Sequence, residues 1–418
     1  MKRYRRDVAD ASSPARSQGP TLRRAITFPW LVLYGLGTTI GAGIYALTGV
    51  VAGRAGLYAP VCFLVASTIA LFTALSFAEL SSRFPRAGGE AVYVHEGTGW
   101  AWLSTLVGGL IVVAGLVSAA TLCVAFVGYL SEFVALPPLL ALSVVVLGIG
   151  SIASWGVRES VVIASVLTMV EVGGLVLIVA YGGAQLAELP SRLPDMLPRD
   201  LEASGLVASA AVLAFYAFLG FEDIVNVAEE VRDVRRAMPR AIMTTLAVTV
   251  LLYVLVASVA VLSVPVGELG ESNAPLALVF ERCGGSPRLL GAIAILAVLN
   301  GALVQVIKAA RVLFGLASQG LMPRFLGRVH RRTRTPLVAT ALSTGAVAAL
   351  AASFPLAALA ASTSLVTLVT FSLANLSLIL VKQRGPAPAD CTVFPIWVPS
   401  VGLLLNLALI AFEALRFT

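Results

Sequence analysis

Residues 37–45 read GTTIGAGIY and lie in the middle of an apolar stretch that runs from about Pro29 to Val51. Such a stretch is long enough to cross a bilayer as a helix. Its centre nevertheless contains three glycines and two threonines, which are poor helix formers. Close helix packing is one explanation for glycine in a membrane helix. The concentration of glycine, and hydroxyls able to satisfy freed backbone groups, instead predict that this helix is interrupted near Gly41.

The composition extends this reading to the whole chain of 418 residues, which is 58% hydrophobic and only 12% charged, with a mean hydropathy of +0.94. One soluble domain of this length cannot bury so much apolar surface. We therefore predict an all-α integral membrane protein with about eleven transmembrane helices, twelve being possible. The apolar segments lie near 29–51, 58–82, 100–130, 138–155, 160–182, 205–228, 240–264, 287–317, 336–353, 357–381 and 394–415.

Basic residues are concentrated in alternate loops between these segments, which hold 21 of the 29 lysines and arginines. This asymmetry is typical of the cytoplasmic loops of membrane proteins. It explains the net charge of +7 without a nucleic-acid partner, and it predicts a cytoplasmic N-terminus in a multi-pass protein of the plasma membrane. Residues 1–24 lack the apolar core of a secretory signal, so we interpret them as a basic cytoplasmic tail.

A second interrupted segment, AFYAFLGFEDIVNVAEE at 214–230, falls in the sixth span. Paired interruptions at corresponding places in two halves indicate an inverted-repeat transporter. We therefore predict a leucine-transporter-like 5+5 arrangement. Residues 25–185 form its first repeat, residues 203–384 form its second, and residues 385–418 add a C-terminal helix.

The two breaks suit the two charged groups of one ligand. The amides that open the second half of the first helix would carry roughly half a positive charge and could bind a carboxylate. The carbonyls that end the first half of the sixth span would attract an ammonium group. A carboxylate and an ammonium on the same small molecule describe an α-amino acid.

Five stretches of the chain resemble the amino acid, polyamine and organocation transporter superfamily, in particular bacterial permeases similar to cationic amino acid transporters. They are GTTIGAGIYALTG at 37–49, FAELSSRFPRAGGEAVYV at 77–94, GVRES at 156–160, FLGFEDIVNVAEEV at 218–231 and NGALVQVIKAARVLFGLASQGLMP at 300–323. Their order and spacing agree with the superfamily over most of the chain. The resemblance implies alternating access and secondary transport of amino acids, driven by protons or by exchange.

The resemblance also implies site residues. The carboxylate-binding stretch is matched by Ile40, Gly41, Ala42, Gly43 and Ile44, and the break in the sixth span by Phe215, Ala217, Phe218 and Leu219. Phe215 or Tyr216 is the candidate for the aromatic ring that covers the substrate.

Ionisable residues within spans are few and are usually functional. Related permeases often have a lysine at the position of Glu171, and the ammonium group of that lysine stands in the place of a sodium ion. This chain has a carboxylate at that position, so the same role cannot be assigned to residue 171. We predict that Glu171 either pairs with Lys308 or takes up a proton alone. Glu222 stands where an aspartate is more usual, and Asp223 follows it directly. The candidates for gating or coupling are Tyr216, Glu171, Lys308 and Glu222.

The sequence gives less support to other functions. The carboxylates Glu222 and Asp223 would suit a transporter of polyamines or other organic cations, which is one alternative. A transporter-like receptor or subunit is a further alternative. We expect no enzyme, because no nucleophile with a base and no phosphate-cradling loop is apparent. We also expect no cofactor, no metal site and no obligate protein partner. The predicted partners are the amino acid substrate, membrane lipids and, if the cycle is driven by protons, protons. The four cysteines have no metal-like spacing and suit packing.

Overall fold

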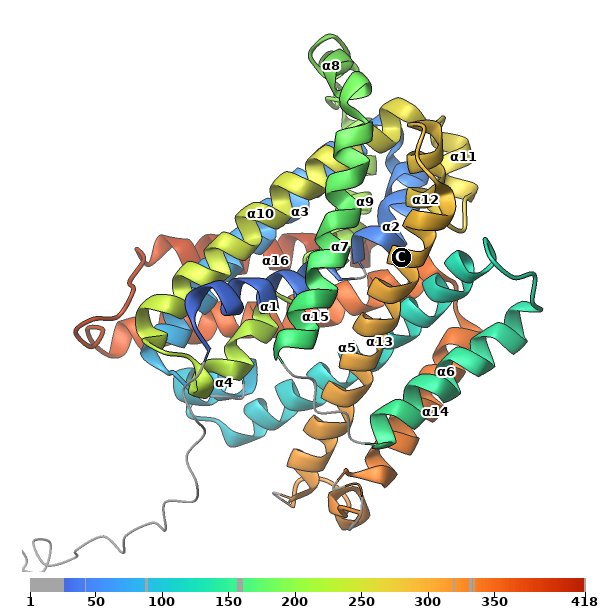
Figure 1. The fold of residues 1–418 in the computed structure, drawn as a ribbon. Coiled ribbons are helices and arrows are strands. Elements are labelled where there is room, and N and C mark those ends of the chain that lie inside the picture. The colour runs from blue at the N-terminus through green and yellow to red at the C-terminus, as the bar shows by residue number, and fades with distance from the viewer. Residues whose placement is uncertain are drawn as a thin grey trace, which may run out of the picture.

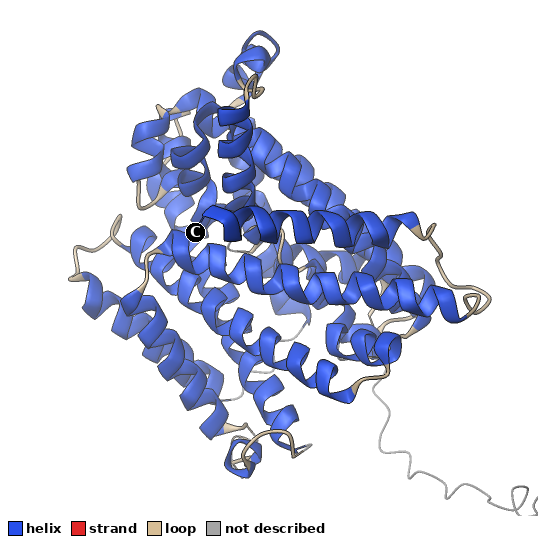
Figure 2. Cartoon of the chain, turned by 180° about the vertical axis from the view of Figure 1, so that it is seen from behind, coloured by secondary structure: helices blue, strands red, loops and turns tan. Residues whose placement is uncertain are grey.

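A computed structural model describes residues 26–41, 43–86, 89–155, 161–318, 320–330, 333 and 335–416. The predicted N-terminal tail therefore lies outside the described residues. The described chain is helical throughout, apart from its connecting loops and one isolated bridge between Ile26 and Val231 (Figure 2). The prediction of an all-α fold is confirmed.

Sixteen α-helices and four short 3₁₀ segments follow one another in the described residues. In chain order they are α1 (Phe28–Ile40), α2 (Gly43–Ala55), η1 (Gly56–Tyr58), α3 (Ala59–Arg83), α4 (Gly89–Thr98), α5 (Ala101–Leu130), α6 (Pro138–Trp155), α7 (Val161–Tyr181), α8 (Gly183–Arg192), η2 (Leu193–Asp195), α9 (Leu201–Tyr216), η3 (Phe221–Glu230), α10 (Val234–Ser263), α11 (Val266–Glu271), α12 (Pro275–Arg282), α13 (Pro287–Ser318), η4 (Arg324–Gly327), α14 (Leu337–Ser353), α15 (Leu356–Arg384) and α16 (Trp397–Arg416).

Eight of the described helical stretches are long and apolar enough to cross a membrane. One of them, Phe28–Arg83, has 56 residues and contains two of the predicted segments; as one straight helix it would be about 84 Å long, far more than a bilayer requires. The bent pair Ser165–Tyr181 and Gly183–Asp195, at 66°, and the shorter helix Leu337–Ser353 supply the fifth and ninth predicted segments. Each of the eleven predicted segments thus corresponds to an apolar helix, and the chain is a multi-pass membrane protein.

The interrupted helices occupy the centre of the molecule. Helix α1 packs against α7 and α10, whereas α2 packs against α9 and α11. Two long pairs flank them, with α3 beside α10 and α5 beside α13 (Figure 1). Because helices surround both breaks, the backbone there is shielded from lipid, which is where irregular backbone is tolerated at membrane depth.

Loops that the charge pattern assigns to one side of the membrane meet at one end of the molecule. The Ser82 hydroxyl donates to the Arg235 carbonyl, and the Arg235 guanidinium reaches the Ala389 carbonyl at 3.4 Å. The Arg384 guanidinium donates to the Glu96 carbonyl at 2.9 Å. These contacts support the alternation of loops from which the sidedness was predicted; which side is the cytoplasm stays a prediction.

Candidate functional site

The first helix is interrupted where its glycines predicted. Helix α1 ends at Ile40, Gly41 forms a turn, and α2 begins at Gly43. Ile40, Gly43 and Ile44 are all buried. The predicted site residue Ala42 lies outside the described residues. The first amides of α2 have no acceptor within their own helix, as at any helix start, so the break directs donors into the protein interior.

The sixth span is interrupted too. Helix α9 ends at Tyr216, and Ala217 to Gly220 form a turn in which each of three amides bonds to the carbonyl three residues earlier. Gly220 has a φ of +122°, which a residue with a side chain rarely adopts. The chain then continues as the 3₁₀ segment η3 rather than as an α-helix.

The two breaks lie directly against each other. A Cβ added to Gly43 would be 2.5 Å from the Ala217 Cα, so only glycine allows these backbones to approach so closely. On the other side of the turn, a Cβ on Gly220 would overlap the Thr38 carbonyl. The Thr38 hydroxyl donates to the Gly220 carbonyl at 3.0 Å and so joins α1 to the turn. Close packing and interruption are therefore not alternatives here, because the interrupted segments are also the closely packed ones.

Tyr253 on α10 connects the ends of both half-helices and was not predicted from the sequence. Its buried hydroxyl lies 3.0 Å from the Thr39 carbonyl at the end of α1 and 2.9 Å from the Ala217 carbonyl after α9. These are the negative ends of two helix dipoles. The only signal in the sequence was a single polar aromatic residue at the middle of an apolar span, which fits an ordinary core residue equally well.

The three aromatic residues around the second break point to different neighbours. Phe215 packs edge-on against Phe371 of α15, with ring centroids 6.1 Å apart. Phe218 packs against Tyr253 at 5.1 Å. Tyr216 instead reaches α5, where its hydroxyl lies 2.9 Å from the Ser118 hydroxyl. Both candidates for the covering ring thus reach a further helix, Phe215 through a ring contact with α15 and Tyr216 through its hydroxyl to α5.

Glu171 of α7 is buried beside the first break. A Cβ at Gly41 would be 3.9 Å from one Glu171 carboxylate oxygen. The other oxygen accepts a hydrogen bond from the Asn300 amide of α13 at 3.3 Å, and the Tyr45 hydroxyl donates to the Glu171 backbone carbonyl at 2.6 Å. The structure therefore places this carboxylate next to the predicted carboxylate-binding stretch.

The predicted pairing of Glu171 with Lys308 is wrong. The Lys308 ammonium donates to both carboxylate oxygens of Asp223, at 2.9 and 3.1 Å. Lys308 follows Asn300 by eight residues, or about 12 Å along a helix, so it lies at a different depth from Glu171. Helices α7 and α13 do pack against each other, but Glu171 and Lys308 meet other partners at different depths.

Glu222 lies between the break and this ion pair. Its carboxylate accepts a hydrogen bond from the Gly220 amide at 2.7 Å, which holds the turn of the second break in place. Glu222 and Asp223 are both buried. The organic-cation alternative rested on these two carboxylates, and each already has a partner within the protein: Lys308 for Asp223 and the Gly220 amide for Glu222.

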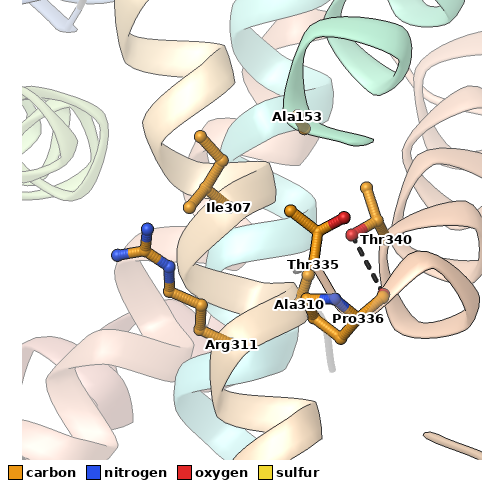
Figure 3. Close-up of a pocket in the computed structure, with 7 residues that line it drawn as sticks. All are labelled: Ala153, Ile307, Ala310, Arg311, Thr335, Pro336 and Thr340. Carbon is orange, nitrogen blue, oxygen red and sulfur yellow. Dashed lines mark hydrogen bonds between the residues drawn. The ribbon is translucent and has the colours of Figure 1, made fainter. Parts of the chain in front are cut away.

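Arg311 follows Lys308 by one helical turn and lines a small pocket of about 40 Å³ between α13 and α14. Figure 3 shows its guanidinium group directed away from Thr340, whose hydroxyl bonds to the Pro336 carbonyl at 3.2 Å. Arg311 itself is exposed. Arg311 is therefore not one of the buried groups at the two breaks.

Known proteins with similar sequences are transporters. The chain is 27% identical over 435 residues to a branched-chain amino acid permease of Bacillus subtilis, covering 98% of this chain and 91% of that protein. It is 29% identical over 420 residues to a mitochondrial cationic amino acid transporter of Arabidopsis thaliana, covering 92% of this chain and 67% of that protein. An uncharacterized transporter of Mycobacterium tuberculosis is 31% identical over 391 residues, covering 92% and 84% of the two chains. The family model for amino acid permeases matches residues 26–415, and the chain therefore belongs to the amino acid permease family.

Proposed function

We propose that this permease binds a neutral, apolar α-amino acid between its two helix breaks and carries it across the plasma membrane by alternating access. The observation that carries the proposal is the contact of the two breaks at Gly43 and Ala217, with Tyr253 joining the ends of both half-helices. In the same proposal, residues 25–185 and 203–384 are the two repeats that move relative to each other, and the N-terminus is cytoplasmic.

The charges at the breaks suit the two ends of an amino acid. A substrate carboxylate would bind the amides that open α2, near Gly43 and Ile44, where the helix dipole is positive. The ammonium would bind carbonyls at the end of α9. The Ala217 carbonyl already accepts the Tyr253 hydroxyl, but a carbonyl oxygen has two lone pairs and can accept a second donor. Tyr216 would cover the bound substrate.

The surroundings of the breaks favour an uncharged side chain. Ile40, Ile44 and Phe215 supply apolar surface. The carboxylates nearby already have partners: Lys308 donates to Asp223, and the Gly220 amide donates to Glu222. A lysine or arginine side chain would have to leave water for a site where Lys308 already carries a positive charge, which costs free energy that a branched aliphatic side chain does not require.

Uptake by purified protein in liposomes tests the substrate class. We expect radiolabelled leucine to accumulate and excess unlabelled valine or isoleucine to compete, with arginine and putrescine competing weakly. A screen of amino acids by thermal shift should rank them in the same order, because a ligand that binds only the folded state stabilises it. Uptake of putrescine with no competition from leucine would show an organic-cation transporter. Binding of an amino acid without any transport would support the receptor alternative.

Glu171 is the proposed coupling group within this mechanism. A substrate carboxylate at the first break would lie close to the Glu171 carboxylate, and two adjacent anions in a buried site favour uptake of a proton. We expect Glu171→Gln to keep leucine binding and exchange but to lose accumulation driven by a proton gradient. Unchanged gradient-driven accumulation by this variant would remove Glu171 from the coupling mechanism and leave the substrate assignment intact.

A further inference from the structure

A second group of buried charges surrounds the ion pair between Asp223 and Lys308. Glu222 and Asp223 come from η3, Lys308 from α13, and Glu90 from the first turn of α4. The three carboxylate residues expose only 6 to 7% of their surface. Three buried carboxyl groups and the partly exposed Lys308 side chain thus come together from three elements.

Glu90 is directed toward this group by the packing of α4 on η3. A Cβ on the preceding Gly89 would be 3.3 Å from the Asn226 side-chain oxygen, and the Asn226 amide lies 3.4 Å from an Asp223 carboxylate oxygen. The Glu90 carboxyl interacts electrostatically with both Lys308 and Asp223. Among the described residues, Lys308 is the cation that acts on it.

The single ammonium group of Lys308 cannot neutralise all three carboxylates of this group. Lys308 gives hydrogen bonds to both oxygens of Asp223, so its charge is largely committed to that partner. Glu222 has one backbone amide and no cation within hydrogen-bonding distance in the described chain. An ionised carboxylate that is buried without a cation is costly, and taking up a proton removes that cost.

The elements packed against α4 bring no further compensating charge. Helix α5 contains no lysine, arginine, aspartate or glutamate. The cations at the end of α15 are used elsewhere, Lys382 by Glu79 and Arg384 by the Glu96 carbonyl. Within α4, the buried Tyr93 near Glu90 can donate a hydrogen bond but carries no positive charge. On α13, Arg311 is exposed.

We propose that Glu90 and Glu222, arranged around the Asp223–Lys308 pair, form a proton-binding site that holds a proton while α4 and η3 are packed together. The existence of the site does not depend on the proposed substrate, whereas its part in the transport cycle rests on the proposed function. Separation of η3 from α4 would let water reach the carboxyls, and the proton would then leave. Opening at this end of the molecule is therefore coupled to loss of a proton.

The sign of the pH dependence follows from Glu90, which lies outside the membrane-spanning helices. Burial raises the pKa of Glu90 to about 7, and the Lys308 charge opposes part of that rise. The packed arrangement is stable below that pKa, where Glu90 is neutral. It loses stability as the pH rises through about 7, because the group becomes an uncompensated buried anion.

Infrared titration of the purified protein tests the site without any substrate. The absorption of protonated carboxyl groups is recorded from about pH 5.5 to about pH 8.5, a range that brackets the Glu90 pKa by roughly 1.5 units. We expect one protonated carboxyl that titrates near pH 7 in the wild type and is lost in Glu90→Gln. Glu96→Gln is the matched control, since Glu96 is on the same helix but pairs with Arg86 at an exposed position. Removing the cation with Lys308→Gln should shift the titration to higher pH.

The outcomes separate this proposal from the proposed function. Loss of the signal in Glu90→Gln alone supports the site even if leucine is not transported. Equal titrations of Glu90→Gln, Glu96→Gln and wild type would overturn it. A midpoint that moves when sodium is replaced by a bulky organic cation would also overturn it, because the site would then bind a metal cation. If leucine is transported, Glu90→Gln should reduce the pH dependence of leucine exchange at least about fivefold, and Glu96→Gln should not.

Discussion

Replacing Gly43 by alanine is the smallest change that tests whether the contact between the breaks forms the transport site. The added Cβ would be 2.5 Å from the Ala217 Cα and 3.1 Å from its Cβ, whereas carbon atoms in contact are about 3.5–4.0 Å apart. The obstacle is backbone, so no change of rotamer relieves it. The two breaks must separate by roughly 1 Å, because the required distance exceeds the available one by that amount.

A displacement of this size should act on function more than on folding. Overpacking of this kind typically costs about 1–3 kcal/mol of stability, which a folded protein of this size tolerates. A 1 Å misplacement of binding groups can cost about a hundredfold in rate. We therefore expect Gly43→Ala to insert in the membrane normally and to lower leucine uptake by about 10- to 100-fold in proteoliposomes.

Gly173→Ala is the matched control for this experiment. Gly173 also lies in an apolar helix, and a Cβ there meets no atom within 4 Å. This variant should transport leucine at the wild-type rate. Near-normal uptake by Gly43→Ala, or an equal loss in both variants, would refute the reasoning that the two breaks must touch for transport.

Two further predictions concern polar groups that hold the core together. Tyr253→Phe keeps the ring but removes the hydroxyl that lies between two carbonyls, and leucine affinity should fall about tenfold. Tyr129→Phe is the control, because it removes a buried tyrosine hydroxyl that is bonded to one carbonyl. This control variant should change stability more than leucine affinity. Equal affinities of the two variants in a binding titration would show that the hydroxyl of Tyr253 only supports packing. Glu79→Gln should lower the thermal midpoint markedly, because the fully buried Glu79 holds the nearly buried Lys382, and breaking a buried ion pair costs about 3–5 kcal/mol. Glu268→Gln, at an exposed pair, should change it by about 1 kcal/mol or less, and similar melting curves for the two would contradict this ranking.

Much of the architecture could be predicted from the sequence because membrane insertion imposes strong local rules. A span needs about 20 apolar residues, so hydropathy alone located the eleven segments. Poor helix formers in mid-span can be tolerated only where surrounding protein replaces the lost hydrogen bonds, so the glycines near Gly41 and Gly220 indicated both breaks. Such features are properties of single segments, and a segment shows them wherever it packs.

Side-chain partners could not be predicted in the same way. Lys308 was predicted to pair with Glu171, yet it binds Asp223. The sequence separation of the two residues says nothing about the depth at which each meets its neighbour. The role of Tyr253 was not predicted for a related reason, since a single polar aromatic residue in an apolar span forms no sequence pattern that indicates its partners. Its role appears only where the ends of α1 and α9 meet.

The sequence by itself therefore determined the helical class, the number of apolar segments and the position of both breaks, because each depends on composition over one local stretch. The tertiary structure decided which groups the breaks bring together: Gly43 against Ala217, Tyr253 between two helix ends, and Glu90 beside a saturated ion pair. Those pairings depend on the depth and rotation of helices far apart in the chain. Packing of the whole molecule sets these quantities, and no single segment contains them.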